Sequence, residues 1–207
     1  RKNPSTLLNI SILKKSINLK KSFINKLIDM IDDNMSILRE AELIENKIIV
    51  QDSVLKGQLV EKGFGESKGR ELILDLHEGL FLVAKKKIKI KAGKKNVLGK
   101  TLLELGLTTD KNFYSKSLVY ADIRDNGYTI KTGLKFGFDF RIYPKKKKMG
   151  QAHSKFGINV LTENKKISMT QISKTTRLAG NIHIEAILAV VDNENSISYY
   201  SLNRKLF

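Results

Sequence analysis

The chain of 207 residues contains no cysteine, and its acidic residues are few for the number of basic ones. Without cysteine the protein forms no disulfide bond and no metal site with thiolate ligands. No uninterrupted apolar run is long enough to span a bilayer, and no signal peptide pattern is found. The sequence therefore predicts a soluble protein of the cytoplasm that has no membrane partner.

The shortage of negative charge leaves a large positive excess. There are 38 Lys and Arg residues against 21 Asp and Glu residues, a formal net charge of +17. Genome base composition and adaptation to heat also enrich lysine, but neither explains why lysine so outnumbers the acidic residues. An excess of this size favours a polyanionic partner that is bound through its phosphate groups.

The length favours one large domain or two small ones, and 41% hydrophobic residues are enough for a core. A break near residues 108–111 divides the chain into two halves, each of which mixes helices with short strands, so we predict an α+β fold. The predicted helices cover residues 7–33, 52–62, 76–86, 96–105, 113–124 and 168–181. The predicted strands are a hairpin over 37–50, an edge strand over 86–91, and strands over 128–132, 135–143, 153–161, 182–192 and 196–202. Residues 71–76 are predicted as a strand or the start of the next helix.

The segment over residues 133–160 carries the strongest chemical signal. Apolar residues alternate with polar ones in its first strand and are predicted to share the buried face: Phe136, Phe138, Phe140 and Ile142. Tyr143 then lies on the polar face with Asp139 and Arg141. By itself, Tyr143 is better interpreted as an ordinary tyrosine at a strand end with a hydrated hydroxyl.

A basic loop follows this strand, which Pro144 ends because proline cannot donate to the ladder. The loop contains a run of four lysines: Lys145, Lys146, Lys147 and Lys148. Such runs are usually solvated, but this one lies between Tyr143 and His153, which begins the return strand. If the two strands are neighbours, both side chains stand near the ends of one loop and can converge.

These residue types suit metal-free cleavage of RNA. When a 2′-hydroxyl attacks its own phosphate, a base takes the 2′ proton, an acid protonates the 5′ leaving oxygen, and a cation neutralises the phosphorane. Histidine donates or accepts a proton near neutral pH, and tyrosine acts as a base where a cation assists it. The sequence therefore predicts no cofactor and no metal.

The chain resembles the archaeal tRNA-splicing endonuclease family over about residues 43–204. The blocks that carry this resemblance are ENKIIVQD, GFGESKGRELILDLHEGLFLV, YADIRDNGYTIKTGLKFGFDFRIY, AHSKFGINV, TTRLAG and AILAVVDNENSISYY. It implies a small mixed α/β domain over 43–110 and a nuclease domain over 111–207, with a mixed or antiparallel sheet flanked by helices. Residues 1–42 form a helical extension outside the resemblance.

The resemblance implies that the protein cuts precursor tRNA at intron boundaries folded as a bulge–helix–bulge, leaving a 2′,3′-cyclic phosphate and a 5′-hydroxyl. The family uses a Tyr, His and Lys triad, in which Tyr143 takes the base position and His153 the acid position. Ile184 occupies the position of the lysine. Either a nearby lysine, such as Lys155 or Lys174, replaces it, or this chain is a non-cutting subunit.

Further residues take roles by resemblance. Arg177 matches an arginine that stacks on a bulged base, and Arg204 is a second candidate for this contact. Asp192 and Glu194 lie in a turn that matches an acidic loop inserted into a neighbouring subunit. The resemblance thus implies a homo- or hetero-oligomer, and the alternative from another class is a basic RNA-binding protein without an enzymatic role.

Overall fold

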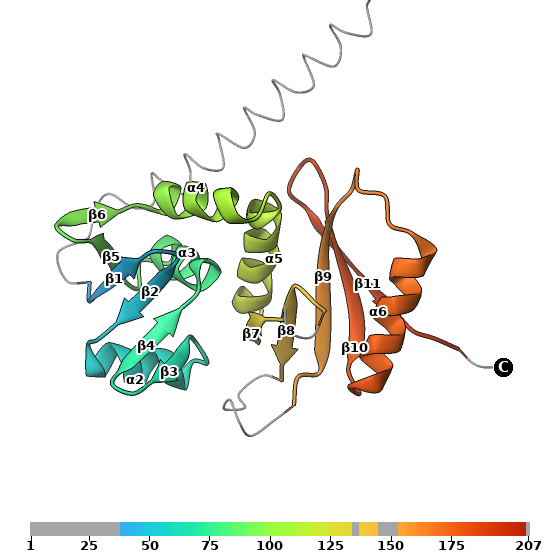
Figure 1. The fold of residues 1–207 in the computed structure, drawn as a ribbon, viewed down its shortest axis with the longest axis horizontal. Helices are drawn as coiled ribbons and strands as arrows, with labels where there is room; N and C mark the ends of the chain where they lie inside the picture. Colours follow the sequence, from blue (N-terminus) through green and yellow to red (C-terminus); the bar gives the residue numbers. More distant parts are fainter. Residues whose placement is uncertain (1–37, 134–136, 145–152, 206–207) are drawn as a thin grey trace, which may run out of the picture.

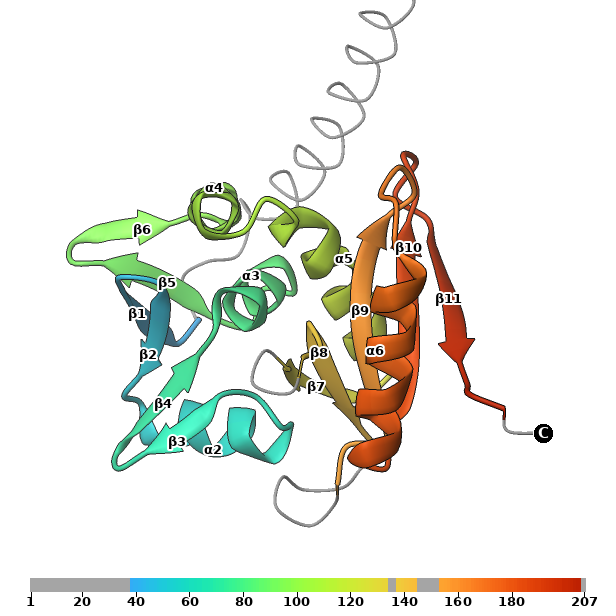
Figure 2. The same cartoon turned by 45° about the vertical axis from the view of Figure 1, so that its right-hand side comes forward.

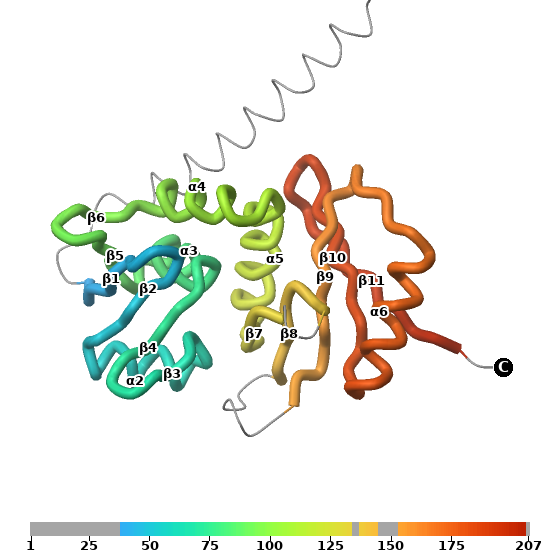
Figure 3. The backbone as a smooth tube through the Cα atoms, in the orientation of Figure 1, coloured from blue at the N-terminus to red at the C-terminus, as the bar shows by residue number. Residues whose placement is uncertain are grey.

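The computed structural model describes residues 38–133, 137–144 and 153–205. Two mixed β-sheets lie side by side in Figure 1, and helix α5 (Phe113–Asp125) stands between them. The smooth trace in Figure 3 shows that the blue and green N-terminal half is separate from the yellow and red C-terminal half. The predicted α+β fold is confirmed. The helix predicted over residues 7–33 lies outside the described residues.

The N-terminal half is a sheet with helices on one face. Its strands are β1 (Glu40–Ile44), β2 (Lys47–Val50), β3 (Glu66–Lys68), β4 (Glu71–Leu74), β5 (Lys89–Ala92) and β6 (Lys95–Val97), in the order β3-β4-β2-β1-β5-β6. Its helices are α2 (Ser53–Glu61), α3 (Leu76–Ala84) and α4 (Gly99–Thr109). All neighbouring strands are antiparallel except β1 and β5. Alternate residues of the central strands, such as Ile48, Leu74 and Ile90, point into a core that the helices complete.

The hairpin and the first helix of this half agree with the sequence prediction. Helix α2 begins after Asp52, whose side chain accepts a hydrogen bond from the amide of Leu55 at 2.6 Å. Residues 71–74 form a strand, and the helix starts only at Leu76, because Asp75 and Glu78 make a capping box at that point.

Two predictions in this half are wrong. The lysine-rich segment over 86–91 is not an edge strand, because β5 pairs with β1 on one side and with β6 on the other. The helix predicted over 96–105 instead begins at Gly99 and continues through Gly106 to Thr109. Gly106 does not end this helix. Its missing side chain makes room for the ring of Phe113, which lies 2.3 Å from where a Cβ atom would stand.

The C-terminal half is a five-stranded sheet with one helix on each face. Its strands are β7 (Thr129–Thr132), β8 (Phe140–Tyr143), β9 (Phe156–Thr162), β10 (Glu185–Val191) and β11 (Ile197–Leu202), in the order β11-β10-β9-β8-β7. The parallel pair β9 and β10 is joined through α6 (Met169–Asn181). In Figure 2, α6 lies across the sheet near the viewer, and α5 lies behind the sheet.

Two separate apolar clusters hold these helices. Residues such as Val119 of α5 pack with Phe140 and Ile142 on one face. On the other face, Ala179 of α6 packs with Phe138 and Ala186. The prediction that Phe138 shares a face with Phe140 and Ile142 is therefore wrong.

The physical reason lies in the start of β8. The strand begins only at Phe140, because Gly137 has a φ of +71°, which breaks the extended backbone that the alternating pattern assumed. Phe136, the fourth residue of that predicted face, lies outside the described residues.

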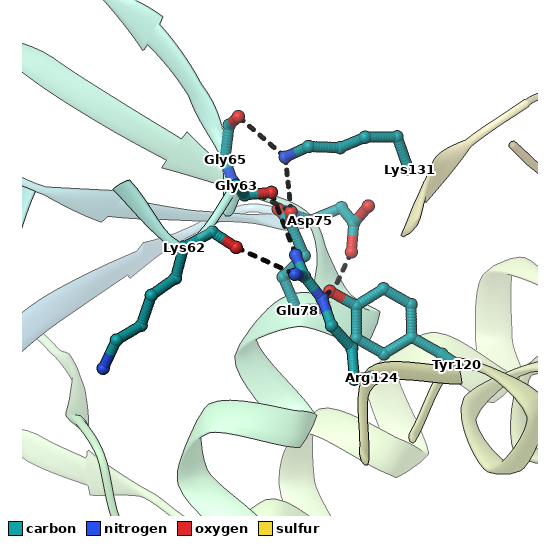
Figure 4. A network of polar contacts seen from close by, with 8 residues as sticks. All are labelled: Lys62, Gly63, Gly65, Asp75, Glu78, Tyr120, Arg124 and Lys131. Carbon is teal, nitrogen blue, oxygen red and sulfur yellow. Dashed lines mark hydrogen bonds and ion pairs between the residues drawn. The ribbon is translucent and has the colours of Figure 1, made fainter. Parts of the chain in front are cut away.

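The two halves are joined by a buried polar network, which is drawn in Figure 4. Lys131 of β7 donates from Nζ to Glu78 Oε1 and to the carbonyl of Gly65, both at 2.7 Å. Glu78 and Lys131 are almost inaccessible, with side chains 3% and 9% exposed. Arg124 of α5 donates to the carbonyls of Lys62 and Gly63, each at 2.9 Å. The network therefore fixes the C-terminal sheet against the N-terminal half.

A half-buried histidine lies in the same contact between the halves. The ring of His77 stacks on Phe113 with centroids 4.2 Å apart and meets the edge of Phe140 at 5.3 Å. Its Nδ1 atom is 2.9 Å from the hydroxyl of Ser117. Burial lowers the pKa of His77 to about 4, and the nearby charge of Lys116 lowers it further in the same direction.

We expect this histidine to make the fold sensitive to mild acid. Above the unfolded pKa of about 6.5, His77 is neutral in both states. Between about pH 6.5 and the folded value of about 4, only the unfolded chain binds the proton, so the free energy of unfolding falls as the pH falls. Urea unfolding at pH 7 and at pH 4 should show wild type losing about 2 kcal/mol more than His77→Phe, which keeps the stacking but has no titrating group. Equal losses in the two proteins would contradict this.

Candidate functional site

The candidate site lies where β8 ends and β9 begins. Tyr143 is the last residue of β8, and its side chain is half-buried. The strands are antiparallel, with Ile142 opposite Phe156, and the amide of Lys155 donates to the carbonyl of Ile142 at 2.8 Å. The next pair in this register sets Tyr143 directly opposite Lys155. Directly opposed residues share a face, with Cβ atoms about 4.5–5.5 Å apart.

The third strand continues the row. Glu185 pairs with Phe156 in the parallel ladder, and its amide donates to the carbonyl of Lys155 at 3.0 Å. The preceding residue, Ile184, is therefore the neighbour of Lys155. Tyr143, Lys155 and Ile184 thus follow one another across β8, β9 and the start of β10, on the face that α6 covers.

Ile184 is a packing residue in this structure. Its Cδ1 atom lies 2.8 Å from where Gly157 would carry a Cβ atom, and the Phe138 ring lies at the same distance. Any larger residue at position 157 would displace both side chains. Ile184 therefore belongs to the apolar cluster under α6, together with Leu178 and Ile182.

His153 lies at the same end of the sheet as Tyr143. It is exposed and stands two residues before Lys155. The expectation that His153 begins the return strand is wrong, since β9 begins at Phe156 and residues 153–155 lead into it. The pairing of β8 with β9 nevertheless places the end of β8 next to the start of β9. The four predicted loop lysines, 145–148, lie outside the described residues.

Arg141 places a positive charge near Tyr143. The guanidinium carbon of Arg141 is 5.7 Å from the centre of the Tyr143 ring. Arg141 precedes Tyr143 by two residues and shares its face, which is a signal that sequence reasoning noted but did not use for the site. The Nζ atom of Lys155 lies 5.2 Å from the centre of the Phe156 ring. Phe156 packs on the α5 face, so the ammonium of Lys155 lies over that ring, and it is the backbone register that sets Lys155 opposite Tyr143.

The predicted arginines and the acidic turn lie elsewhere on the C-terminal half. Arg177 is exposed on α6, as is Lys174 one turn before it, and Arg204 is exposed after β11. The turn between β10 and β11 forms as expected. Asp192 is used within the turn, because its carboxylate accepts hydrogen bonds from the amides of residues 194 and 196, both at 2.8 Å. Glu194 remains exposed.

Neither a metal centre nor a membrane helix is found in the parts of the chain that the structure describes. Within residues 38–133, 137–144 and 153–205, no three His, Cys, Asp or Glu side chains gather as a group that could hold a metal ion. No helix in those ranges is both long and apolar enough to cross a bilayer.

Comparison with known proteins gives consistent matches over most of the chain. Residues 39–103 match the family model described as tRNA intron endonuclease, N-terminal domain, and residues 113–199 match the one described as tRNA intron endonuclease, catalytic C-terminal domain. Three similar proteins are named tRNA-splicing endonuclease. The one from Methanococcus vannielii is 34% identical over 163 residues, which is 78% of this chain and 92% of that protein. Those from Pyrococcus furiosus and Thermococcus onnurineus are 36% and 39% identical, over 69% and 67% of this chain and 82% and 80% of their own lengths.

Proposed function

Because this chain belongs to the tRNA intron endonuclease family, we propose that it is a subunit of a tRNA-splicing endonuclease that cleaves precursor tRNA itself. Its substrate is the bulge–helix–bulge at the intron boundaries. The observation that carries the proposal is the adjacency of the two strand ends that lead to Tyr143 and His153. An acid and a base carried next to these strand ends can approach the same phosphate.

The reaction is a transfer of the phosphate to the neighbouring 2′-oxygen. Tyr143, as the tyrosinate, takes the 2′ proton while the 2′-oxygen forms a bond to phosphorus. The bond from phosphorus to the 5′-oxygen breaks, and His153, as the imidazolium, gives that oxygen its proton. The products are a 2′,3′-cyclic phosphate and a 5′-hydroxyl, and no metal takes part.

A cation is also needed for the charge that develops on the phosphorane. Ile184 cannot supply it, because its side chain is apolar and packed beneath α6. We assign this role to Lys155, which lies between Tyr143 and Ile184 in the row across the sheet. The four-carbon stem of lysine can reorient its ammonium group toward a bound phosphate. Arg141, whose guanidinium carbon is 5.7 Å from the centre of the Tyr143 ring, adds positive charge beside the tyrosine.

The packing of Ile184 favours a second candidate function. A subunit that has lost one catalytic group can hold RNA and present its acidic turn, with Glu194 exposed at its tip, to an active partner. In both functions the chain acts in a homo- or hetero-oligomer. Arg177 and Arg204 contact the bulged bases, and the loop lysines 145–148 attract the phosphates.

Cleavage of a bulge–helix–bulge RNA distinguishes these functions. The pure chain is incubated with end-labelled RNA, alone and with a partner subunit whose own triad is intact. Cleavage by the chain alone, with 2′,3′-cyclic phosphate ends, supports the first function, and cleavage only with the partner supports the second. RNA binding without cleavage under either condition would indicate a basic RNA-binding protein without an enzymatic role.

Restoring a lysine at position 184 is expected to raise the rate. A lysine there can lay its methylenes on the cluster around Phe138 and extend its ammonium toward Tyr143. We expect Ile184→Lys to cleave at least about tenfold faster than wild type in single turnover. An oriented charge typically raises a rate by about 10²–10³, and the variant should recover part of that factor. The control is Ile182→Lys, which adds the same charge to the same cluster outside the row. Equal rates for the two variants would contradict the assigned position.

A further inference from the structure

The N-terminal half carries its positive charge in one short segment. Residues 85–100 contain eight lysines and no acidic residue. Residues 38–84 contain six basic and nine acidic residues, a net charge of −3. The positive charge of this half is therefore confined to about sixteen consecutive residues, and the composition of the chain as a whole does not account for it.

The segment runs from Lys85, which pairs with Asp125 of α5 where the two halves meet, out to a hairpin at the end of the N-terminal half. The segment consists of the turn after α3, the hairpin of β5 and β6, and the first turn of α4. Figures 1 and 2 show this hairpin at the far end of the N-terminal half, on the opposite side of the molecule from α6. We call it the hairpin patch, and its members are Lys85, Lys86, Lys87, Lys89, Lys91, Lys94, Lys95 and Lys100.

Most of this charge is not neutralised by the fold. Three of the lysines have carboxylate partners: Lys85 with Asp125 at 2.7 Å, Lys91 with Glu40 at 2.7 Å, and Lys100 with Glu104 at 3.9 Å. The other five have no carboxylate oxygen within 4.0 Å anywhere in the described ranges. Four of these five, at positions 86, 87, 94 and 95, are exposed.

Local stability explains only part of the patch. A lysine after the end of α3 interacts favourably with the helix dipole, and a lysine on the edge strand β6 prevents pairing with another sheet. Each purpose needs one or two side chains. Further lysines add repulsion between like charges, which destabilises the fold unless a polyanion binds there.

The composition of the patch indicates which part of a polyanion it contacts. Residues 85–100 contain no aromatic residue and no arginine, the side chains that stack on bases or bind them through two hydrogen bonds. Lysine contacts phosphate as a point charge. A membrane surface would also attract the charge, but the patch has no amphipathic helix, and a single exposed leucine, Leu98, lies beside it.

We propose that the hairpin patch is a second RNA-binding surface, which holds the sugar-phosphate backbone of the substrate outside the cleavage region and without reading its sequence. This proposal rests on the proposed function in one respect, because it takes the bound polyanion to be RNA. Binding there is expected to add affinity and salt dependence, while the chemical step at Tyr143 and His153 proceeds independently.

The test replaces the four exposed lysines of the patch by glutamine, at positions 86, 87, 94 and 95 of the full chain. Binding to a bulge–helix–bulge RNA is measured by filter retention from 50 to 200 mM salt. We expect an affinity about tenfold or more lower at 100 mM salt, and a slope of log K against log salt that is shallower by about 2 to 3. Lys→Arg at the same positions should retain wild-type binding.

A matched variant controls for the loss of charge alone. Four exposed lysines outside the patch, at positions 47, 62, 68 and 111, are replaced by glutamine, and this protein should keep the wild-type slope. Equal slopes for both glutamine variants would overturn the proposal. It would also be overturned if the patch variant bound RNA normally but lost binding to vesicles of phosphatidylserine and phosphatidylcholine. If wild type binds RNA through the patch but never cleaves it, the proposed function fails and the patch stands.

Discussion

Replacing Glu78 by leucine is expected to lower the free energy of unfolding by about 3–5 kcal/mol. The substitution leaves the ammonium of Lys131 buried, with only the carbonyl of Gly65 as a partner. It also removes the acceptor for the amide of Gly65 and the second half of the capping box at the start of α3. Both losses occur where the two halves of the molecule meet. Urea unfolding followed by circular dichroism measures the change.

Two further variants show whether the buried charge is the cause. In Glu78→Leu with Lys131→Met, no charge remains in the contact, so the double variant should be more stable than Glu78→Leu alone. The exposed pair of Lys100 and Glu104 is the matched control, and Glu104→Gln should cost about 0.5 kcal/mol or less. A double variant that is less stable than Glu78→Leu would show that the ion pair is not the main contribution.

Replacing His153 by alanine is expected to reduce the cleavage rate about 10²–10⁴-fold, and Tyr143→Phe should reduce it by a similar factor. The first change removes the proton donor for the 5′-oxygen, and the second removes the acceptor of the 2′ proton. Neither residue lies in an apolar cluster of the described structure, so folding and RNA affinity should change little. Single-turnover cleavage at saturating protein measures the rate apart from binding.

The chain offers matched controls for both changes. His183 is exposed with a φ of +54°, a conformation that asparagine also adopts, so His183→Asn removes a histidine without straining the backbone. Tyr200 is 55% exposed on β11, which β10 and β9 separate from β8, so Tyr200→Phe removes a hydroxyl from the opposite edge of the sheet. Both controls should cleave at the wild-type rate. If His153→Ala leaves cleavage unchanged in the presence of an active partner, this chain is the non-cutting subunit.

Local signals in the sequence were sufficient where an element depends on its own residues. Helix α6 begins where Ser168 and Gln171 form a capping box, and the turn after β10 forms where Asp192 accepts two amides. Predictions failed where a distant residue decides the outcome. The helix predicted over 96–105 continues past Gly106, whose missing side chain makes room for Phe113, and β5 is not an edge strand because it pairs with both β1 and β6.

The candidate site also combines residues that the sequence indicates with contacts that only the fold creates. Tyr143 and His153 were identified from their order around a basic loop, and the family from blocks spread along the chain. The position of Lys155 between Tyr143 and Ile184 depends on the register of three strands, which no local pattern specifies. The network of Glu78 and Lys131 joins residues that are 53 positions apart, and neither residue carries a sequence signal of its own.

The sequence by itself determined the α+β class, most of the helices and strands, the family, the positive charge that favours a polyanionic partner, and the presence of residues suited to acid–base chemistry. These features depend on composition and on short-range spacing, both of which are visible in the order of residues. Only the tertiary structure decided that Ile184 packs beneath α6, that Lys155 lies between Tyr143 and Ile184, and that the hairpin of β5 and β6 stands at the far end of the N-terminal half. Those arrangements arise from strand pairing and burial between distant segments, whose free energy depends on the whole fold.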